Sequence, residues 1–204
     1  MYVPPNFKVE DKNEIVAFMK KYNFANLVSQ VKGRLWATHI PFVIVEQGDE
    51  VKLIAHISKG NRQWKAIETQ EVMVIFNGSH AFVSADWYDH ENVSTWNYQT
   101  VHAYGKVRVL EGAALFEAVK MLNEKYEHPS SSAHIDNISP DFVAREMHGI
   151  VGVEVTVTEL VAAYKMSQNR DNHNFNEIII QLENTKNVDS QQVADNMRLL
   201  KKDN

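Results

Sequence analysis

The sequence contains no cysteine and no long apolar run. Without cysteine, the 204 residues cannot form disulfides, thiolate nucleophiles, or zinc and iron–sulfur sites built on Cys. No run of about 18 apolar residues is present that could cross a bilayer as a helix. Residues 1–6 also lack the charged and apolar segments of a secretory signal. We therefore expect a cytoplasmic protein.

Positive charge is also scarce. Lys and Arg total 21 against 26 Asp and Glu, which gives a net charge of -5. This excess of negative charge repels phosphate backbones and acidic membrane surfaces. No helix-turn-helix signature or basic stripe offsets it. The sequence therefore argues against direct DNA binding and against a membrane partner.

Several catalytic motifs are missing. The sequence has no dinucleotide-binding glycine fingerprint, P-loop, nucleophile elbow or zincin motif. The nine histidines include no pair three or four residues apart, so one helix cannot supply two metal ligands. We expect no metal site, and the sequence identifies no catalytic residue.

Hydrophobic residues make up 44% of the chain, and β-rich stretches dominate its first 165 residues. We predict strands over Phe24–Val31, Leu35–Glu46, Val51–Ile57, Val72–Phe76, Ala81–Ser84, Thr100–Leu110 and Ile150–Tyr164. Helices are predicted from Asp11 to the mid-twenties and over 61–68, 112–126, 140–147, 176–182 and 190–200. Strands of antiparallel character with helices inserted favour a mainly β fold, a small closed barrel with added helices. We place a barrel domain at residues 1–170 and a C-terminal helical extension at 171–204.

The stretch after the third predicted strand has the composition of a phosphate site. Ser58 and Lys59 precede a glycine, and Asn61 begins the helix predicted over 61–68. Free backbone N–H groups, the positive end of a helix dipole and neutralising cations together bind phosphate. A solvated polar turn, with Lys59 and Arg62 in water, explains the same residues equally well.

A second stretch could hold a planar ligand. Trp96 and Asn97 precede a strong strand, and an aromatic wall beside an amide suits a heteroaromatic ring with a polar edge. Taken singly, Trp96 is better explained as a core residue. His39 and His56 could face the same cavity, although a structural role explains each of them better.

Several segments, in order, resemble one family. They are Met1-Tyr2-Val3-Pro4, Ala37-Thr38-His39-Ile40-Pro41-Phe42, His56-Ile57-Ser58-Lys59-Gly60-Asn61 with Trp64, Val74-Ile75-Phe76-Asn77-Gly78, Trp87-Tyr88, Thr95-Trp96-Asn97-Tyr98 and Lys165-Met166-Ser167-Gln168-Asn169-Arg170. Together they are similar to the PaiB-type family of FMN-binding negative transcriptional regulators. The resemblance implies an FMN-binding split β-barrel like that of pyridoxamine 5'-phosphate oxidase, and a homodimer with FMN in the cleft between subunits.

The resemblance also implies roles for particular residues. Ser58 and Lys59 would hold the FMN phosphate, with Asn61 and Trp64 in the same motif. Thr38 and His39 would lie along the ribityl or phosphate side. The residues implied to line the cleft are Trp96, Asn97, Gln168 and Asn169. This chain departs from the family pattern in having Lys59 where Arg is usual, which loses a bidentate fork, and in having Ala85-Asp86 and Ser94 where proline is usual.

Three functions remain open. The first is an FMN-binding regulator that represses gene expression, indirectly or through a partner. The second is an FMN-dependent oxidoreductase or flavin reductase, in which the flavin supplies the chemistry and no catalytic side chain is needed. The third and least favoured is a haem-binding protein with His39, His56 or His102 as the axial ligand.

Overall fold

The computed structural model describes residues 1–202, so the last two residues of the predicted C-terminal extension, 203 and 204, lie outside the described part. The chain divides into two compact units. We call Val16–Phe76 with His102–Leu160 the barrel unit, and Met1–Ile15 with Asn77–Val101 and Val161–Asn204 the terminal unit. The predicted boundary between residues 170 and 171 stays a prediction.

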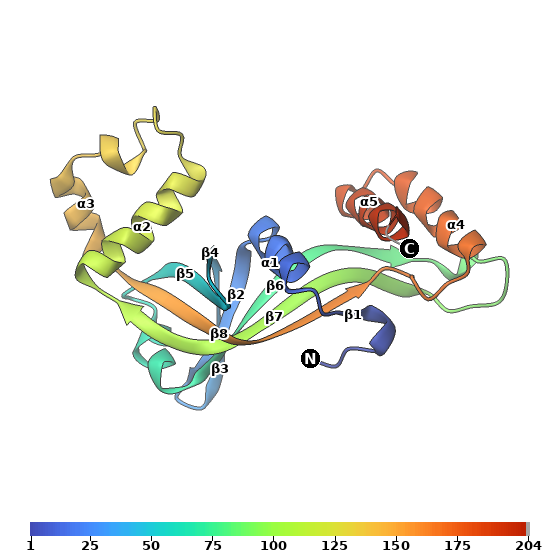
Figure 1. The fold of residues 1–204 in the computed structure, drawn as a ribbon, viewed down its shortest axis with the longest axis horizontal. Coiled ribbons are helices and arrows are strands. Elements are labelled where there is room, and N and C mark those ends of the chain that lie inside the picture. Colours follow the sequence, from blue (N-terminus) through green and yellow to red (C-terminus); the bar gives the residue numbers. More distant parts are fainter. Residues whose placement is uncertain (203–204) are drawn as a thin grey trace. The chain divides into compact units, whose positions relative to one another are not determined.

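An antiparallel sheet forms the framework (Figure 1). Its strands are β1 (Lys8–Val9), β2 (Phe24–Val31), β3 (Arg34–Pro41), β4 (Val43–Gln47), β5 (Glu50–Ser58), β6 (Glu71–Val83), β7 (Thr95–Leu110) and β8 (Ile150–Lys165). Hydrogen bonding runs in the order β3-β2-β6-β7-β8-β5-β4, and β1 pairs with β8. Within the barrel unit β3 also contacts β5, which lies near the other end of this path. The fold is mainly β with added helices, the split β-barrel that the sequence predicts.

Two hairpins build the ends of this path. β2 pairs with β3 through Lys32 and Gly33, both with positive φ (52° and 77°). β4 pairs with β5 through Gly48, whose φ is 58°. The consecutive left-handed residues Lys32 and Gly33 match the twist of a two-residue hairpin loop. The β4–β5 turn, in which Gln47 pairs with Glu50, sets the register of β5, which ends at Ser58.

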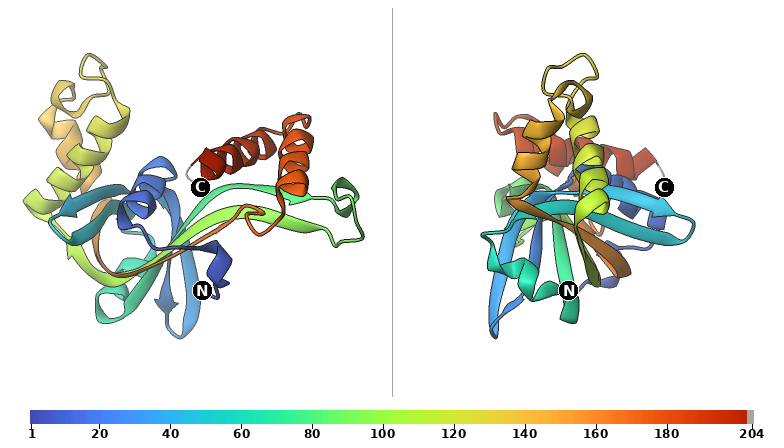
Figure 2. Two further views of the ribbon diagram at one scale, coloured as in Figure 1. Left: turned by 45° about the vertical axis from the view of Figure 1, so that its right-hand side comes forward. Right: turned by 90° about the vertical axis from the view of Figure 1, so that its left-hand side faces the viewer.

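Helices complete both units (Figures 1 and 2). They are α1 (Lys12–Lys21), α2 (Gly112–Tyr126), α3 (Pro140–Met147), α4 (Asn172–Glu183) and α5 (Val188–Lys202), with single 3-10 turns η1 (Pro5–Phe7), η2 (Arg62–Lys65), η3 (Ile67–Thr69), η4 (Ala85–Trp87) and η5 (Ile135–Asn137). Asp11 begins α1 as predicted, because its carboxylate accepts from the N–H groups of Asn13 and Glu14. In the terminal unit α4 packs on α5. No helix of residues 1–202 is long and apolar enough to cross a bilayer.

Each unit has its own core. In the barrel unit Leu27, Phe42, Leu53 and Phe76 are fully buried, and the Phe42 and Phe76 rings lie 6.0 Å apart. In the terminal unit the facing sides of α4 and α5 are buried through Ile178, Ile179, Leu182, Val193 and Met197. Burial of these side chains supplies the main favourable free energy of folding.

Three sequence expectations differ from the structure. The predicted strand Leu35–Glu46 is two strands, β3 and β4, separated at Phe42, whose N–H donates to the Asn23 carbonyl. The predicted strands Val72–Phe76 and Ala81–Ser84 are one continuous strand, β6. The helix expected over 61–68 is the pair of 3-10 turns η2 and η3. The helix whose dipole was expected to help bind phosphate is therefore replaced by two short turns.

Candidate functional site

The predicted phosphate loop lies in the barrel unit at the end of β5. Ser58 and Lys59 are exposed. The loop is closed by its own backbone, since Gly60 N donates to Ser58 Oγ at 3.1 Å and Asn61 N donates to the Ser58 carbonyl at 2.9 Å. Lys59 N donates to the Gly149 carbonyl at 2.8 Å, which ties the loop to the start of β8. The loop is therefore an ordered turn.

A buried amide, Gln63, holds this turn against β2 and β3. Its Nε2 donates to the Leu27 carbonyl at 3.0 Å and to Ser29 Oγ at 2.9 Å. Its Oε1 accepts from Thr38 Oγ1 at 2.5 Å. Gln63 is fully buried, so these bonds lie away from water. The sequence reasoning missed Gln63, although a glutamine flanked by Asn61 and Trp64 in the motif was a usable signal.

Asn61 and Trp64 complete the support. Asn61 caps η2, because its Oδ1 accepts from Gln63 N at 3.1 Å, and its Nδ2 donates to Thr38 Oγ1 at 2.8 Å. Trp64 Nε1 donates to the Lys59 carbonyl at 3.0 Å. Thr38, Asn61 and Trp64 therefore meet at one turn beside Ser58 and Lys59. Their polar atoms are used in holding the turn.

The groups that this turn offers to a phosphate are not all those that the sequence predicts. η2 spans only four residues, which gives a small dipole. The N–H groups of Lys59, Gly60, Asn61 and Gln63 already have acceptors in the chain. What stays available is the Ser58 hydroxyl proton and the cations Lys59 and Arg62, both exposed and without an ion pair among the described residues. A hydroxyl and two cations with no anion fit a phosphate.

The three histidines considered as candidate ligands differ in their exposure. His39 is exposed on β3, opposite Asn26 of β2, and it takes no part in the Gln63 network. His56 on β5 and His102 on β7 are half-buried, and in each the Nδ1 atom is buried without a hydrogen-bond partner. Burial lowers the pKa of both His56 and His102 below the ordinary value. Both are neutral near pH 7.

A pocket of about 500 Å³ adjoins the turn within the barrel unit. Its walls are Lys59, the start of α2, the end of α3 and the start of β8, through Glu111, Gly112, Leu115, Ala144, Met147, His148 and Ile150. The lining combines an ammonium group, a carboxylate and an imidazole with aliphatic side chains. Lys59 therefore borders both the turn and a space that could take part of a small molecule.

The other predicted site residues belong to the terminal unit. Asn97 is fully buried; its Oδ1 accepts from Ser167 Oγ at 3.0 Å. Gln168 closes the loop after β8, because its Oε1 accepts from Met166 N at 2.7 Å and its Nε2 donates to the Tyr164 carbonyl at 2.6 Å. Ser167 has a left-handed φ of 58°, uncommon for a residue with a side chain. Asn97 and Gln168 therefore shape this loop, whereas Asn169 is exposed.

Trp96 does not occupy the core position that its residue type favours. Its side chain is 52% exposed on β7, beside Phe82 of β6, which is 46% exposed. The two ring centroids lie 5.9 Å apart, and the His80 ring lies 6.0 Å from that of Trp96. These three rings form an exposed aromatic patch on the terminal unit.

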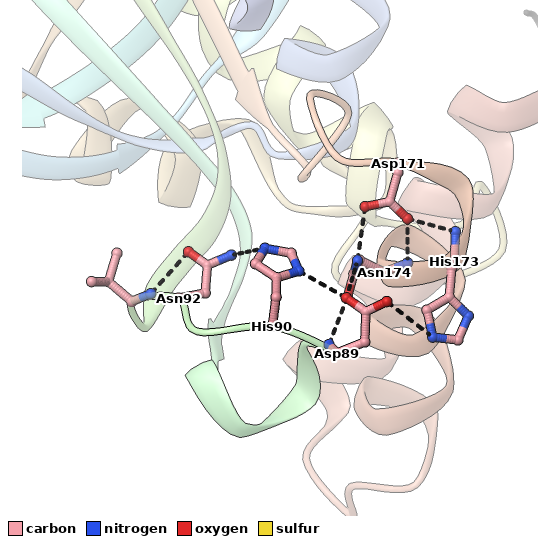
Figure 3. A network of polar contacts seen from close by, with 7 residues as sticks. Asp89, His90, Asn92, Asp171, His173 and Asn174 are labelled. Carbon is pink, nitrogen blue, oxygen red and sulfur yellow. Dashed lines mark hydrogen bonds and ion pairs between the residues drawn. The ribbon is translucent and has the colours of Figure 1, made fainter.

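A polar network joins the 85–95 loop to the start of α4 (Figure 3). The Asp89 carboxylate accepts from Asn174 Nδ2 at 2.9 Å and lies 2.7 Å from His90 Nδ1. Asp171 caps α4 by accepting from the N–H groups of His173 and Asn174. Hydrogen bonds from His90 and then from Asn174 lower the pKa of Asp89, and those from the Asn174 side chain and then its backbone N–H lower the pKa of Asp171. Across residues 1–202 no three His, Asp or Glu side chains are arranged to hold a metal ion.

Comparison with known proteins agrees with this picture. Residues 1–159 match the family described as "Putative FMN-binding domain". The chain is 40% identical over 199 residues to the Bacillus subtilis "Protease synthase and sporulation protein PAI 2", covering 97% of this chain and 96% of the relative.

Solved structures share the fold. The FAD and heme binding protein from Mycobacterium smegmatis superposes with a TM-score of 0.60 at 16% identity, over 78% of this chain and 73% of that one. The flavocytochrome Anf3 from Azotobacter vinelandii gives 0.55 at 15% identity, over 78% and 69%. Given its match to the family and to PAI 2, the chain belongs to the FMN-binding domain family, as a protein of the PaiB type.

Proposed function

We propose that this chain is a flavin-binding regulatory protein that holds the FMN phosphate at Ser58, Lys59 and Arg62. The observation that carries the proposal is an ordered turn whose hydroxyl and two cations have no anion to bind, in a chain of the FMN-binding family. Thr38, Asn61 and Trp64 act by holding this turn. Bound FMN supplies electron or hydride transfer, and the protein supplies binding and orientation.

The regulatory part of the proposal is repression of gene expression through a partner or a metabolite. The net charge of -5 disfavours direct contact with a DNA backbone. The relative in Bacillus subtilis carries a name that refers to protease synthesis and sporulation, which are cellular processes rather than a reaction. An FMN-dependent oxidoreductase is the alternative, and NAD(P)H-driven reduction of bound flavin would favour it.

The proposal includes a homodimer. Phe82 and Trp96 expose a contiguous aromatic surface, and large exposed aromatic groups mark protein interfaces. Dimerisation through this patch would cover both rings. Light scattering on the wild type and on Phe82→Ser/Trp96→Ser tests it, because loss of the patch should give a monomer; a wild-type monomer would refute the dimer.

The phosphate assignment is tested by titrating FMN and following the quenching of flavin fluorescence. Lys59→Ala should weaken FMN binding by about 10- to 100-fold, the usual worth of one charge-assisted hydrogen bond. Ser58→Ala/Lys59→Ala should weaken it further. Lys106→Ala is the matched control, since Lys106 is an exposed cation on β7 of the same unit. An unchanged affinity in the double variant, or an equal loss in Lys106→Ala, would overturn the assignment.

The regulatory role needs a cellular measurement. Transcript levels compared between cells with the wild type, cells without the protein and cells with Lys59→Ala should show genes whose repression depends on this chain. If FMN is required, Lys59→Ala should behave like the deletion. If no transcript changes in the deletion strain, the regulatory role is wrong, and flavin reduction becomes the function to pursue.

A further inference from the structure

A second group of cationic donors, in the terminal unit, has no anionic partner among the described residues. Lys165 ends β8, and its ammonium group donates to Thr95 Oγ1. Because Thr95 Oγ1 accepts from Lys165, its own hydroxyl proton points elsewhere. Arg170 lies five residues beyond Lys165, with its guanidinium carbon 5.1 Å from the centre of the Tyr88 ring. Lysine and arginine side chains are donors only.

The neighbouring carboxylates do not neutralise these cations. Asp89 and Asp171 adjoin Tyr88 and Arg170 in the sequence, and Figure 3 shows both of them occupied by other groups. Asp171 accepts from the first N–H groups of α4, and Asp89 accepts from Asn174 and contacts His90. Neither Lys165 nor Arg170 has an ion pair in the described part of the chain. The two positive charges are therefore unbalanced.

The loop that presents the cations is held in one conformation. Arg170 N donates to the Ser167 carbonyl at 3.0 Å, which closes a turn. Ser167 is buried with a left-handed φ of 58°, and its hydroxyl is fixed by buried Asn97. A strained residue persists only where its surroundings over-determine it, and such residues cluster at ligand sites. Stacking on Tyr88 limits the rotamers of Arg170.

The amino group of Lys165 also carries an electrostatic cost. Partial burial, and then the charge of Arg170, lower the pKa of Lys165 below its ordinary value. A bound anion would remove that cost, because it would stabilise the charged form.

We propose that Thr95, Lys165 and Arg170 form a binding site for a small organic anion that carries a carboxylate or a phosphate group. The planar guanidinium can pair with two oxygens of either group, and the Lys165 ammonium and the Thr95 hydroxyl supply further donors to the same oxygens or, in a phosphate, to a third one. The ligand is an effector of the protein other than FMN, and the residues that bind it belong to the terminal unit.

The test is a titration of isotope-labelled full-length protein followed by NMR of the backbone amides. Sodium acetate and inorganic phosphate are added separately at constant ionic strength, with FMN as a third arm. One of the two small anions should shift the amides of Thr95 and 165–170 saturably, and the one that binds more tightly identifies the ligand class. Binding at alkaline pH should be accompanied by proton uptake, because the anion raises the lowered pKa of Lys165.

Variants make the test specific. Lys165→Met should weaken anion binding by at least about tenfold, the lower range for a charge-assisted bond, and Arg170→Lys should weaken it while keeping the charge. Lys186→Met, which removes an exposed cation between α4 and α5, should leave binding unchanged. The proposal fails if neither small anion gives a saturable shift. It also fails if Lys186→Met matches Lys165→Met, or if FMN alone shifts these amides, since the cations would then serve the flavin.

Discussion

Replacing Gln63 by leucine should destabilise the barrel unit by about 3 kcal/mol. Three strong side-chain bonds, to Thr38, Ser29 and Leu27, are 2.5, 2.9 and 3.0 Å long. Each is worth about 1 kcal/mol net. Leucine has nearly the volume of glutamine, so packing changes little, but it leaves buried polar partners without a bond. Water cannot replace the amide, because Gln63 has no exposed surface.

The assay is urea unfolding monitored by tryptophan fluorescence. With a slope of about 2 kcal/mol per molar urea, the midpoint should fall by about 1.5 M in Gln63→Leu. The slope itself should not change if the native fold is kept. FMN affinity should also fall, since the Ser58–Lys59 turn loses its anchor to β2 and β3.

Gln70→Leu is the matched control. Gln70 also makes three side-chain bonds, at 2.7 to 2.8 Å, to the backbone of Gln30 and Ala66. Gln70 is only half-buried, so water can take over when its amide is removed. We expect a loss below about 1 kcal/mol. Equal losses in the two variants would refute the reasoning that burial sets the cost.

Further expectations concern backbone packing and pH. Gly105→Ala should destabilise by about 3 kcal/mol or prevent folding, because the new Cβ would lie 2.4 Å from the Thr156 carbonyl oxygen of β8; a wild-type urea midpoint would contradict this. His56 and His102 have lowered pKa values in the folded protein, so the unfolded chain binds more protons as the pH falls below the ordinary histidine value of 6.5. The free energy of unfolding should therefore be highest above about pH 6.5 and decline below it. Between pH 7 and 5 this decline should be shallower in His56→Gln than in the wild type. Identical slopes of unfolding free energy against pH would show that His56 is not responsible.

Local signals in the sequence were sufficient for most elements. The strand predicted over Phe24–Val31 is β2, and the helix predicted over 140–147 is α3, although the Ser139 side chain before it makes no capping bond. We predicted two strands, Val72–Phe76 and Ala81–Ser84, where the structure has β6 alone, and the segment between them, Asn77-Gly78-Ser79-His80, is polar and contains glycine. The structure continues the strand through it, where Ser79 is buried and accepts from Asn196 of α5 at 3.1 Å. That partner lies 117 residues away, so no local pattern contains it.

The candidate site, like the fold, was predictable where its signal is local in the sequence. Ser58 and Lys59 stood out because hydroxyl, cation and glycine occur together in the sequence. Gln63 did not, since its importance comes from Leu27 and Ser29, which reach it only through the fold. The helix dipole expected beyond Asn61 was wrong, because η2 ends after four residues. Residue type gave the charges of the site, whereas tertiary contacts decided which polar atoms remained available.

The distribution of charge bears on how such a protein could regulate genes. Each unit presents a pair of cations that form no ion pair with any described residue, Lys59 with Arg62 and Lys165 with Arg170, on a chain whose net charge is -5. Two cations balance the charge of one phosphate monoester, about −2, and exceed that of one carboxylate, so a single small anion is enough to neutralise each pair. A DNA duplex carries one negative charge per about 1.7 Å of its axis, so an acidic chain gains little from two cations and is repelled by the rest. If both pairs bind anions as proposed, they would favour small anions over nucleic acid, and a regulator built this way would respond to metabolites and act through a partner.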